Sequence, residues 1–73
     1  QAEEVIRLCL HILALDNCWG RAYRHLMLAH EQLGDRGQIA RTYQRCVDTL
    51  RDELDVAPSL KTVNLYQQLT SQN

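Results

Sequence analysis

The chain has 73 residues, enough for one small domain and too few for a cofactor-binding fold joined to a substrate-binding fold. Hydrophobic residues make up 45% of it and charged residues 23%, which excludes disorder of the low-hydrophobicity, high-charge kind. The net charge of −1 excludes a strongly basic nucleic-acid platform, because phosphate binding depends on clustered positive charge. With three glycines and one proline, few residues interrupt helices. We therefore predict an all-α fold and a single domain, residues 1–73.

The first predicted helix spans residues 2–15. Its apolar side chains recur at steps of three and four residues, which places them on one face. We expect Glu3 to pair with Arg7 one turn later. Asn17 is expected to take the left-handed conformation in the turn that follows. The predicted buried face consists of Val5, Leu8, Cys9, Ile12 and Leu13.

The second and third predicted helices, residues 19–33 and 36–54, form a tight hairpin. Gly34 fits the C-terminal cap of the second helix, and Asp35 with Gln38 resembles a capping box at the start of the third. Arg45 can pair with Asp48 on the third helix. The predicted buried positions are Ala22, Tyr23, Leu26, Met27, Ala29, His30 and Leu33, then Ile39, Ala40, Tyr43, Cys46, Val47, Leu50 and Leu54.

A fourth helix is predicted over residues 60–70. Pro58 disfavours helix in the residue before it, and Ser59 is a good N-cap. The inward positions are Thr62, Val63, Tyr66 and Leu69.

The chain contains an internal repeat. A shift of 34 residues places the first helix on the third, so that Val5 matches Ile39 and Leu13 matches Val47. A helix–turn–helix period of 34 is the tetratricopeptide spacing, and it predicts four helices in antiparallel hairpins that form a right-handed α-α superhelix. The first helix is then the second helix of a repeat. An ordinary antiparallel helical bundle with accidental spacing is the alternative.

Sites for chemistry are not evident. The three cysteines and three histidines have neither disulfide-framework nor zinc spacing, and we expect reduced thiols, two of them in the core. There is no phosphate loop, nucleophile elbow or facing carboxylate pair. The longest apolar run, residues 5–15, is shorter than the roughly 20 residues that cross a bilayer. We predict no catalysis, no cofactor, no metal and no membrane partner.

A set of residues between positions 22 and 69 forms a recognisable pattern. Its members are Arg24-His25-Leu26-Met27, Gly34-Asp35-Arg36-Gly37, Ala40, Tyr43, Leu50, Glu53-Leu54, Val56-Ala57-Pro58-Ser59, Thr62, Leu65 and Tyr66. With these residues the segment 22–69 resembles the bacterial transcriptional activator domain of the Streptomyces antibiotic regulatory protein family. Asp55 departs from the pattern, because the family usually has Gly after Glu-Leu.

The resemblance implies a non-catalytic regulatory module in the bacterial cytoplasm. In the family this module typically follows a winged-helix DNA-binding domain and supports interdomain or dimer contacts, so DNA would be read outside this chain. We therefore expect a fragment of a larger activator, with the neighbouring domain, a second copy or the transcription machinery as partner. A general tetratricopeptide adaptor outside transcription remains the alternative function.

The first helices of a tetratricopeptide array line its concave surface, and this surface is the predicted partner site. Apolar side chains among polar ones suit a helix or peptide partner. Direct DNA binding through Arg36, Arg41 and Arg45 is the weaker interpretation, because that helix ends in acidic residues. The predicted partner-binding residues are Arg21, Arg24, Leu28, Glu31, Gln32, Leu60, Asn64, Gln67 and Gln68.

Overall fold

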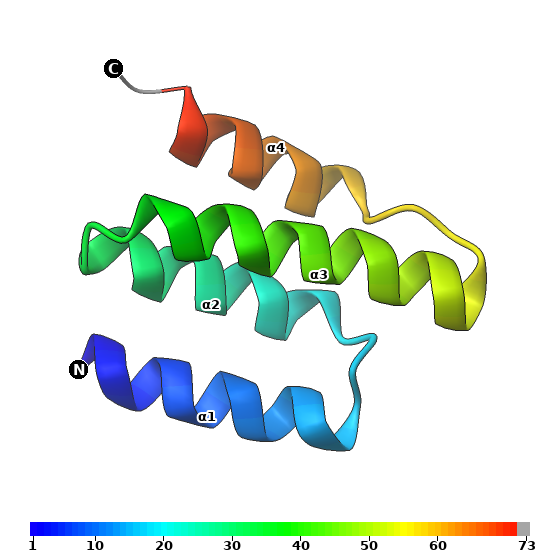
Figure 1. The fold of residues 1–73 in the computed structure, drawn as a ribbon, viewed down its shortest axis with the longest axis horizontal. Helices are drawn as coiled ribbons and strands as arrows, with labels where there is room; N and C mark the ends of the chain where they lie inside the picture. Colours follow the sequence, from blue (N-terminus) through cyan, green and yellow to red (C-terminus); the bar gives the residue numbers. More distant parts are fainter. Residues whose placement is uncertain (72–73) are drawn as a thin grey trace.

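The computed structural model describes residues 1–71, which form four helices and contain no strand (Figure 1). The predicted all-α fold with four helices is confirmed. The last two residues of the predicted domain, 72–73, lie outside the described residues. The helices are α1 (Ala2–Leu15), α2 (Gly20–Gln32), α3 (Arg36–Leu54) and α4 (Leu60–Thr70).

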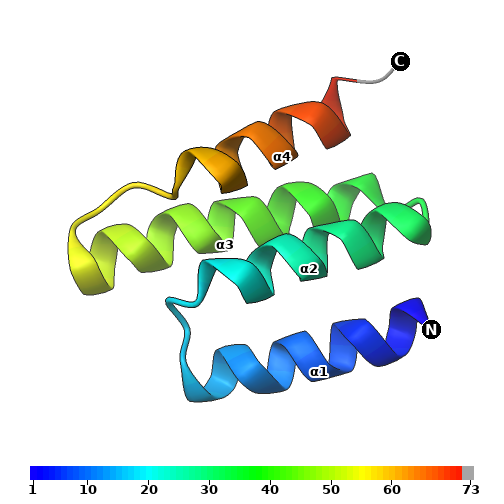
Figure 2. The ribbon, with the colours of Figure 1, turned by 180° about the vertical axis from the view of Figure 1, so that it is seen from behind.

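Consecutive helices run antiparallel, so α1 and α3 point one way and α2 and α4 the other (Figure 1). α3 lies in front of α2 in Figure 1, and the view from behind in Figure 2 brings α2 to the front. α2 packs against each of the other three helices, and α3 also packs against α4. This is the arrangement of stacked tetratricopeptide-like hairpins.

The α2–α3 turn is fixed by backbone hydrogen bonds. Gly34 has a φ of 70°, a left-handed conformation that glycine adopts without steric cost. Its N–H donates to the carbonyl of Glu31 at 3.0 Å, and the N–H of Asp35 donates to that of His30 at 3.0 Å, which is the Schellman pattern. The Asp35 carboxylate accepts from the N–H of Gln38 at 3.1 Å and caps α3 as predicted.

The other helix ends are satisfied in different ways. Asp55 enters the left-handed region at the end of α3, with φ 57° and ψ 40°. Ser59 caps α4 as predicted by accepting a hydrogen bond from the N–H of Thr62. The expectation for Asn17 is wrong, since Asp55 is the non-glycine residue with positive φ in the described range. Instead, the Asp16 carboxylate accepts from the N–H of Cys18 at 3.1 Å, and this bond forms the turn.

The core lies along α2 in two clusters. One joins α1, α2 and α3, and the other joins α2, α3 and α4. Burial of these apolar side chains is the main favourable term that holds the helices together. The first cluster contains Cys9, Leu13, Ala22, Tyr23, Leu26, Cys46 and Leu50; the second contains Met27, Ile39 and Leu69, with Tyr43, Leu65 and Tyr66 partly buried against it.

Tyr23 is the largest fully buried side chain and fixes α2 at two points. Its hydroxyl donates to the carbonyl of Asn17 at 2.7 Å, which ties α2 to the α1–α2 turn. The guanidinium carbon of Arg45 lies 6.0 Å from the ring centroid, within cation–π range. One residue of α2 thus contacts both the turn before it and α3.

The α3–α4 contact includes an aromatic pair. The rings of Tyr43 and Tyr66 are stacked, with centroids 3.9 Å apart and planes inclined by 4°. Such pairs add about 0.5–1.5 kcal/mol beyond the area they bury. The pair helps to hold the short α4 on α3.

The predicted buried face of α1 is partly wrong. Cys9 and Leu13 are buried and Ile12 is partly buried, but Val5 and Leu8 are 39% and 59% exposed. In the 34-residue register, Val5 and Leu8 match Ile39 and Thr42, which are buried on α3. α3 packs this face on α2. Among residues 1–71, no helix covers the corresponding face of α1.

Several other predicted positions differ from the structure. Leu33, Ala40 and Leu54 are exposed and His30 is half-buried, whereas Thr42 is buried and was missed. Leu33 caps α2 and Leu54 is the last residue of α3, so both lie beyond the part of each helix that packs against other helices.

Two predicted ion pairs are also wrong. Arg7 pairs with Glu4 at 3.4 Å instead of Glu3. Asp48 pairs with Arg51 at 3.2 Å, while Arg45 lies over the Tyr23 ring. Exposed ion pairs contribute little to stability, so the spacing of charges on a helix surface does not determine which pair forms.

Replacing Tyr23 with Phe removes the hydroxyl that binds the Asn17 carbonyl and leaves the ring in place. We expect a loss of about 1 kcal/mol in the free energy of unfolding, or roughly 4–8 °C in Tm. Tyr43→Phe is the matched control, since within the described range the Tyr43 hydroxyl makes no hydrogen bond. Equal Tm changes for both variants in a thermal melt followed by circular dichroism would contradict this role.

Asp55→Gly is expected to stabilise the domain, because glycine occupies the left-handed region without the steric penalty of a side chain. We expect a gain of roughly 0.5–1 kcal/mol in chemical denaturation. Asp52→Gly, inside α3, is the control and should lose roughly a few tenths of a kcal/mol through lower helix propensity. A loss of stability in both variants would show that Asp55 carries no strain.

Candidate functional site

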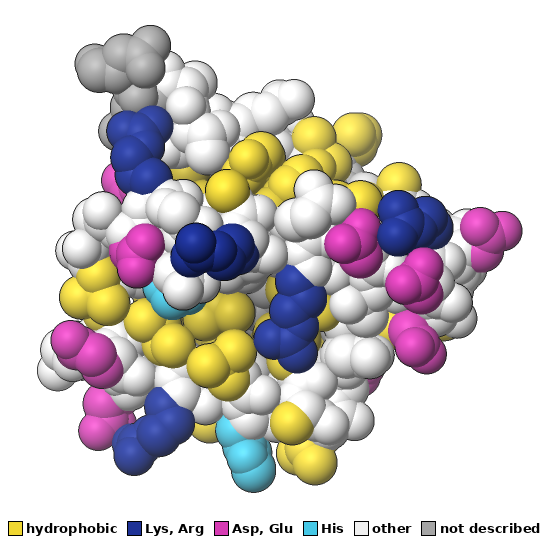
Figure 3. Space-filling view, viewed as in Figure 1, with side chains coloured by type: hydrophobic (Ala, Val, Ile, Leu, Met, Phe, Trp, Pro, Cys, Tyr) yellow, Lys and Arg dark blue, Asp and Glu magenta, His cyan; other side chains and the backbone are white. Residues whose placement is uncertain are grey.

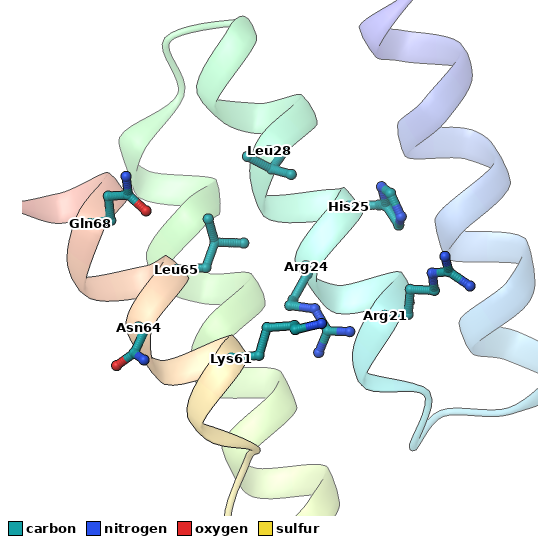
Figure 4. A pocket seen from close by; sticks show the side chains of 8 residues that line it. All are labelled: Arg21, Arg24, His25, Leu28, Lys61, Asn64, Leu65 and Gln68. Carbon is teal, nitrogen blue, oxygen red and sulfur yellow. The ribbon is translucent and has the colours of Figure 1, made fainter.

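A groove runs between α2 and α4, on the side away from α3. Its volume is about 620 Å³ and it is open to solvent. Each helix contributes four residues at positions i, i+3, i+4 and i+7, which is one continuous helical face (Figure 4). The α2–α4 groove is lined by Arg21, Arg24, His25, Leu28, Lys61, Asn64, Leu65 and Gln68.

An adjoining hollow of about 510 Å³ extends the groove past the start of both helices and shares its cationic residues Arg21, Arg24 and Lys61. A Cβ added at Gly20 would lie 3.4 Å from Nη1 of Arg24, an ordinary contact distance. A methyl group would therefore fit at this position without a clash. The remaining lining residues are Cys18, Trp19, Gly20, Leu50, Ser59 and Thr62.

Arg24 is held in place across the groove. Its Nη1 donates to Oγ1 of Thr62 at 2.9 Å, and Thr62 is only 1% exposed. The hydroxyls of Thr62 and Ser59 are 3.3 Å apart and share a hydrogen bond. The N-terminal turn of α4 thus orients the Arg24 guanidinium, which lowers the entropy cost of using its other donors to bind a ligand.

The groove carries positive charge without internal compensation. Arg21, Arg24 and Lys61 line it, and no carboxylate is among its lining residues. Within residues 1–71, the ion pairs belong to Arg7 and Arg51, on other parts of the surface. The side chains of Arg24 and Lys61 reach toward each other between the helices (Figure 4). A ligand with carboxylate groups would be attracted to this point.

The groove also has an apolar part. Leu28 on α2 and Leu65 on α4 both line the groove beyond the cationic residues (Figure 4). Leu28 is 41% exposed although it is a large apolar side chain. An apolar group placed between these leucines would remove them from water.

The structure brings together five of the nine predicted partner-binding residues: Arg21, Arg24, Leu28, Asn64 and Gln68. Gln32, Leu60 and Gln67 are exposed and Glu31 is half-buried, but none of these four lines the groove.

Sequence reasoning missed His25, Lys61 and Leu65 as lining residues. On α4 the predicted face began at Leu60, whereas the observed one begins one residue later, at Lys61. Leu65 follows Lys61 at i+4 and could have been found from the spacing once this phase was known.

A second hollow, of about 320 Å³, lies on the face formed by α1 and α3. Figure 3 shows hydrophobic side chains gathered there, with Lys or Arg side chains beside them. It is lined by Ile6, Leu10, Leu26, His30, Gln38, Arg41, Thr42 and Arg45.

The family model for the bacterial transcriptional activator domain matches residues 1–70. The chain belongs to this family. No curated protein and no solved structure matches the chain. Membership identifies the chain as a transcription-regulator domain, which is not a known enzyme family.

Two further findings concern the part of the bacterial transcriptional activator domain that the structure describes. None of its helices combines the length and the apolar character needed to cross a membrane. Across residues 1–71, no group of three or more His, Cys, Asp or Glu side chains is placed to hold a metal ion.

The cysteines of the domain are free thiols in different surroundings. Cys9 and Cys46 are buried, as predicted for two core thiols, and Cys18 is half-buried. Burial raises the pKa of the Cys46 thiol to about 11, against the opposing effect of the Arg24 guanidinium. Desolvation, then the carboxylates of Glu53 and Asp16, raises the pKa of Cys18.

Alkylation should distinguish the three thiols. Iodoacetamide reacts with the thiolate form of cysteine. The Cys46 thiol stays protonated until the pH approaches its pKa of about 11. At mildly alkaline pH we therefore expect Cys18, which is only half-buried, to be labelled first. Cys9 and Cys46 should react only after denaturant exposes them. Peptide mass spectrometry after timed labelling gives the order, and early labelling of Cys46 in the native protein would contradict the buried position.

Proposed function

We propose that residues 1–73 form one non-catalytic protein-interaction domain of a bacterial cytoplasmic transcriptional activator. The domain would lie next to a separate winged-helix DNA-binding domain and support interdomain, dimer or transcription-machinery contacts. Membership in the bacterial transcriptional activator domain family supports the regulatory role. DNA would be bound by the neighbouring domain.

The α2–α4 groove is the observation that carries this proposal. It is formed by helices that the core already holds in position, so a partner does not need to order it. It combines three cationic side chains, of which Arg24 is oriented by Thr62, with two leucines, a mixture found where proteins bind other proteins. The charge distribution also favours protein over DNA on the α3 side, since Asp52, Glu53 and Asp55 are exposed at the end of that helix.

A general tetratricopeptide-like adaptor outside transcription is the second candidate. The groove by itself fits a peptide or helix from any partner. The two functions differ in what the groove controls, so a transcription readout separates them.

Substitution of Arg24 by Gln together with Leu28 by Ala tests the proposal in the full-length protein. The pair removes one oriented cation and one exposed apolar contact from the groove. We expect target-promoter transcription in a reporter assay to fall about tenfold, the cost of one or two important interface side chains. Helicity should be unchanged in circular dichroism.

Arg41→Gln with Leu54→Ala is the matched control, because both residues are exposed on α3 and outside the groove. Transcription should remain at the unsubstituted level in this variant. If the groove variant is folded and transcription is also unchanged, the proposed role in activation is wrong and the adaptor function is favoured.

A further inference from the structure

We infer that the α2–α4 groove binds an acidic segment of a partner protein, with carboxylates at the cationic residues and an apolar side chain between Leu28 and Leu65. The inference rests on the proposed function and specifies the chemistry of its partner. The groove and the distribution of charge around it carry the argument.

The first step is charge complementarity. Arg21, Arg24 and Lys61 lie in the groove itself, and the hollow that extends it shares all three. No acidic side chain lines either space. The formal net charge of the chain is −1, so the positive charge of the groove is a local concentration. A local positive surface attracts an acidic ligand.

The second step is the donor geometry of Arg24. One of its terminal nitrogens is bound to buried Thr62, which fixes the guanidinium plane. A guanidinium has five N–H donors, so others remain to bind a carboxylate in a charge-assisted pair. Lys61 reaches the same region from α4, and a carboxylate placed there would contact both helices (Figure 4).

The third step is the spacing between the polar and apolar parts. Arg24 and Leu28 are one helical turn apart, which places their Cβ atoms about 6 Å from each other. The acidic and apolar side chains of the ligand must be separated by a similar distance. Alternate residues of an extended segment, or residues one turn apart on a helix, have this separation. The groove face from Arg21 to Leu28 is about 10 Å long, so the recognised segment is short.

The apolar part favours a peptide over nucleic acid. A phosphate backbone offers nothing to Leu28 and Leu65, whereas a leucine or similar side chain would bury both. Arg41 and Arg45 line the hollow on the α1–α3 face, so the positive charge does not form one continuous track for a duplex.

The test uses a labelled peptide in which Asp and Glu residues surround two leucines. Binding to the full-length protein is followed by fluorescence anisotropy at about 50 mM and about 200 mM salt, because weak exposed ion pairs are screened over this range. A second peptide has Asn and Gln in place of the acids, and a third has Ser in place of the leucines. We expect the first peptide to bind about tenfold more tightly than either.

Arg21→Glu with Lys61→Glu reverses two groove charges and leaves the Arg24–Thr62 bond in place. This variant should lose at least about tenfold in affinity for the acidic peptide. Arg7→Glu with Arg41→Glu makes the same change in net charge on α1 and α3 and should bind like the unsubstituted protein. Circular dichroism shows that each variant is folded.

Three outcomes would overturn the inference. They are equal binding of the acidic and neutral peptides, equal weakening by both charge-reversal variants, and displacement of the acidic peptide from the groove by a DNA duplex of arbitrary sequence. If any of them occurs while the Arg24/Leu28 variant still lowers transcription about tenfold, the proposed function stands with a partner of different chemistry. If the peptide binds as expected and that variant still activates transcription, the groove recognises acidic segments but serves another purpose.

Discussion

Burial of α2 between its neighbours is the constraint on which the structure depends. The helix has 13 residues, and an isolated helix of that length is marginal in water. Its stability therefore comes from tertiary packing, with Tyr23 and Leu26 in one core cluster and Met27 in the other. Because α1, α3 and α4 all contact α2, displacing it would disrupt both clusters together.

The groove follows from the same packing. Ala22, Tyr23 and Met27 turn into the core, so the residues on the remaining arc of the helical wheel must face elsewhere. Arg24 and Leu28 emerge on the side of α4, where the matching polar face of that helix stands opposite (Figure 4). The core thus determines which side chains of α2 line the groove.

The internal repeat explains which side of α1 is covered. α1 packs on α2 through Cys9 and Leu13. In the 34-residue register these two residues match Tyr43 and Val47 of α3. Tyr43 in turn packs on α4, through Tyr66. The two successive contacts are therefore equivalent. α3 has a second buried face, which lies on α2 through Ile39, whereas the matching residue Val5 on α1 is exposed. Repeats of this kind are stabilised by their neighbours, and within residues 1–71 no helix covers this side of α1.

The sequence by itself determined the number of helices, the turn at Gly34-Asp35 and the family, because these depend on local propensity, capping and spacing. It also placed Arg21, Arg24 and Leu28 on one helical face of α2, and these residues line the groove. Only the tertiary structure decided the rotation of α4, and hence that Lys61 and Leu65 line the groove. Periodicity defines which residues share a face, but the direction of that face is set by long-range packing such as the Tyr43–Tyr66 contact.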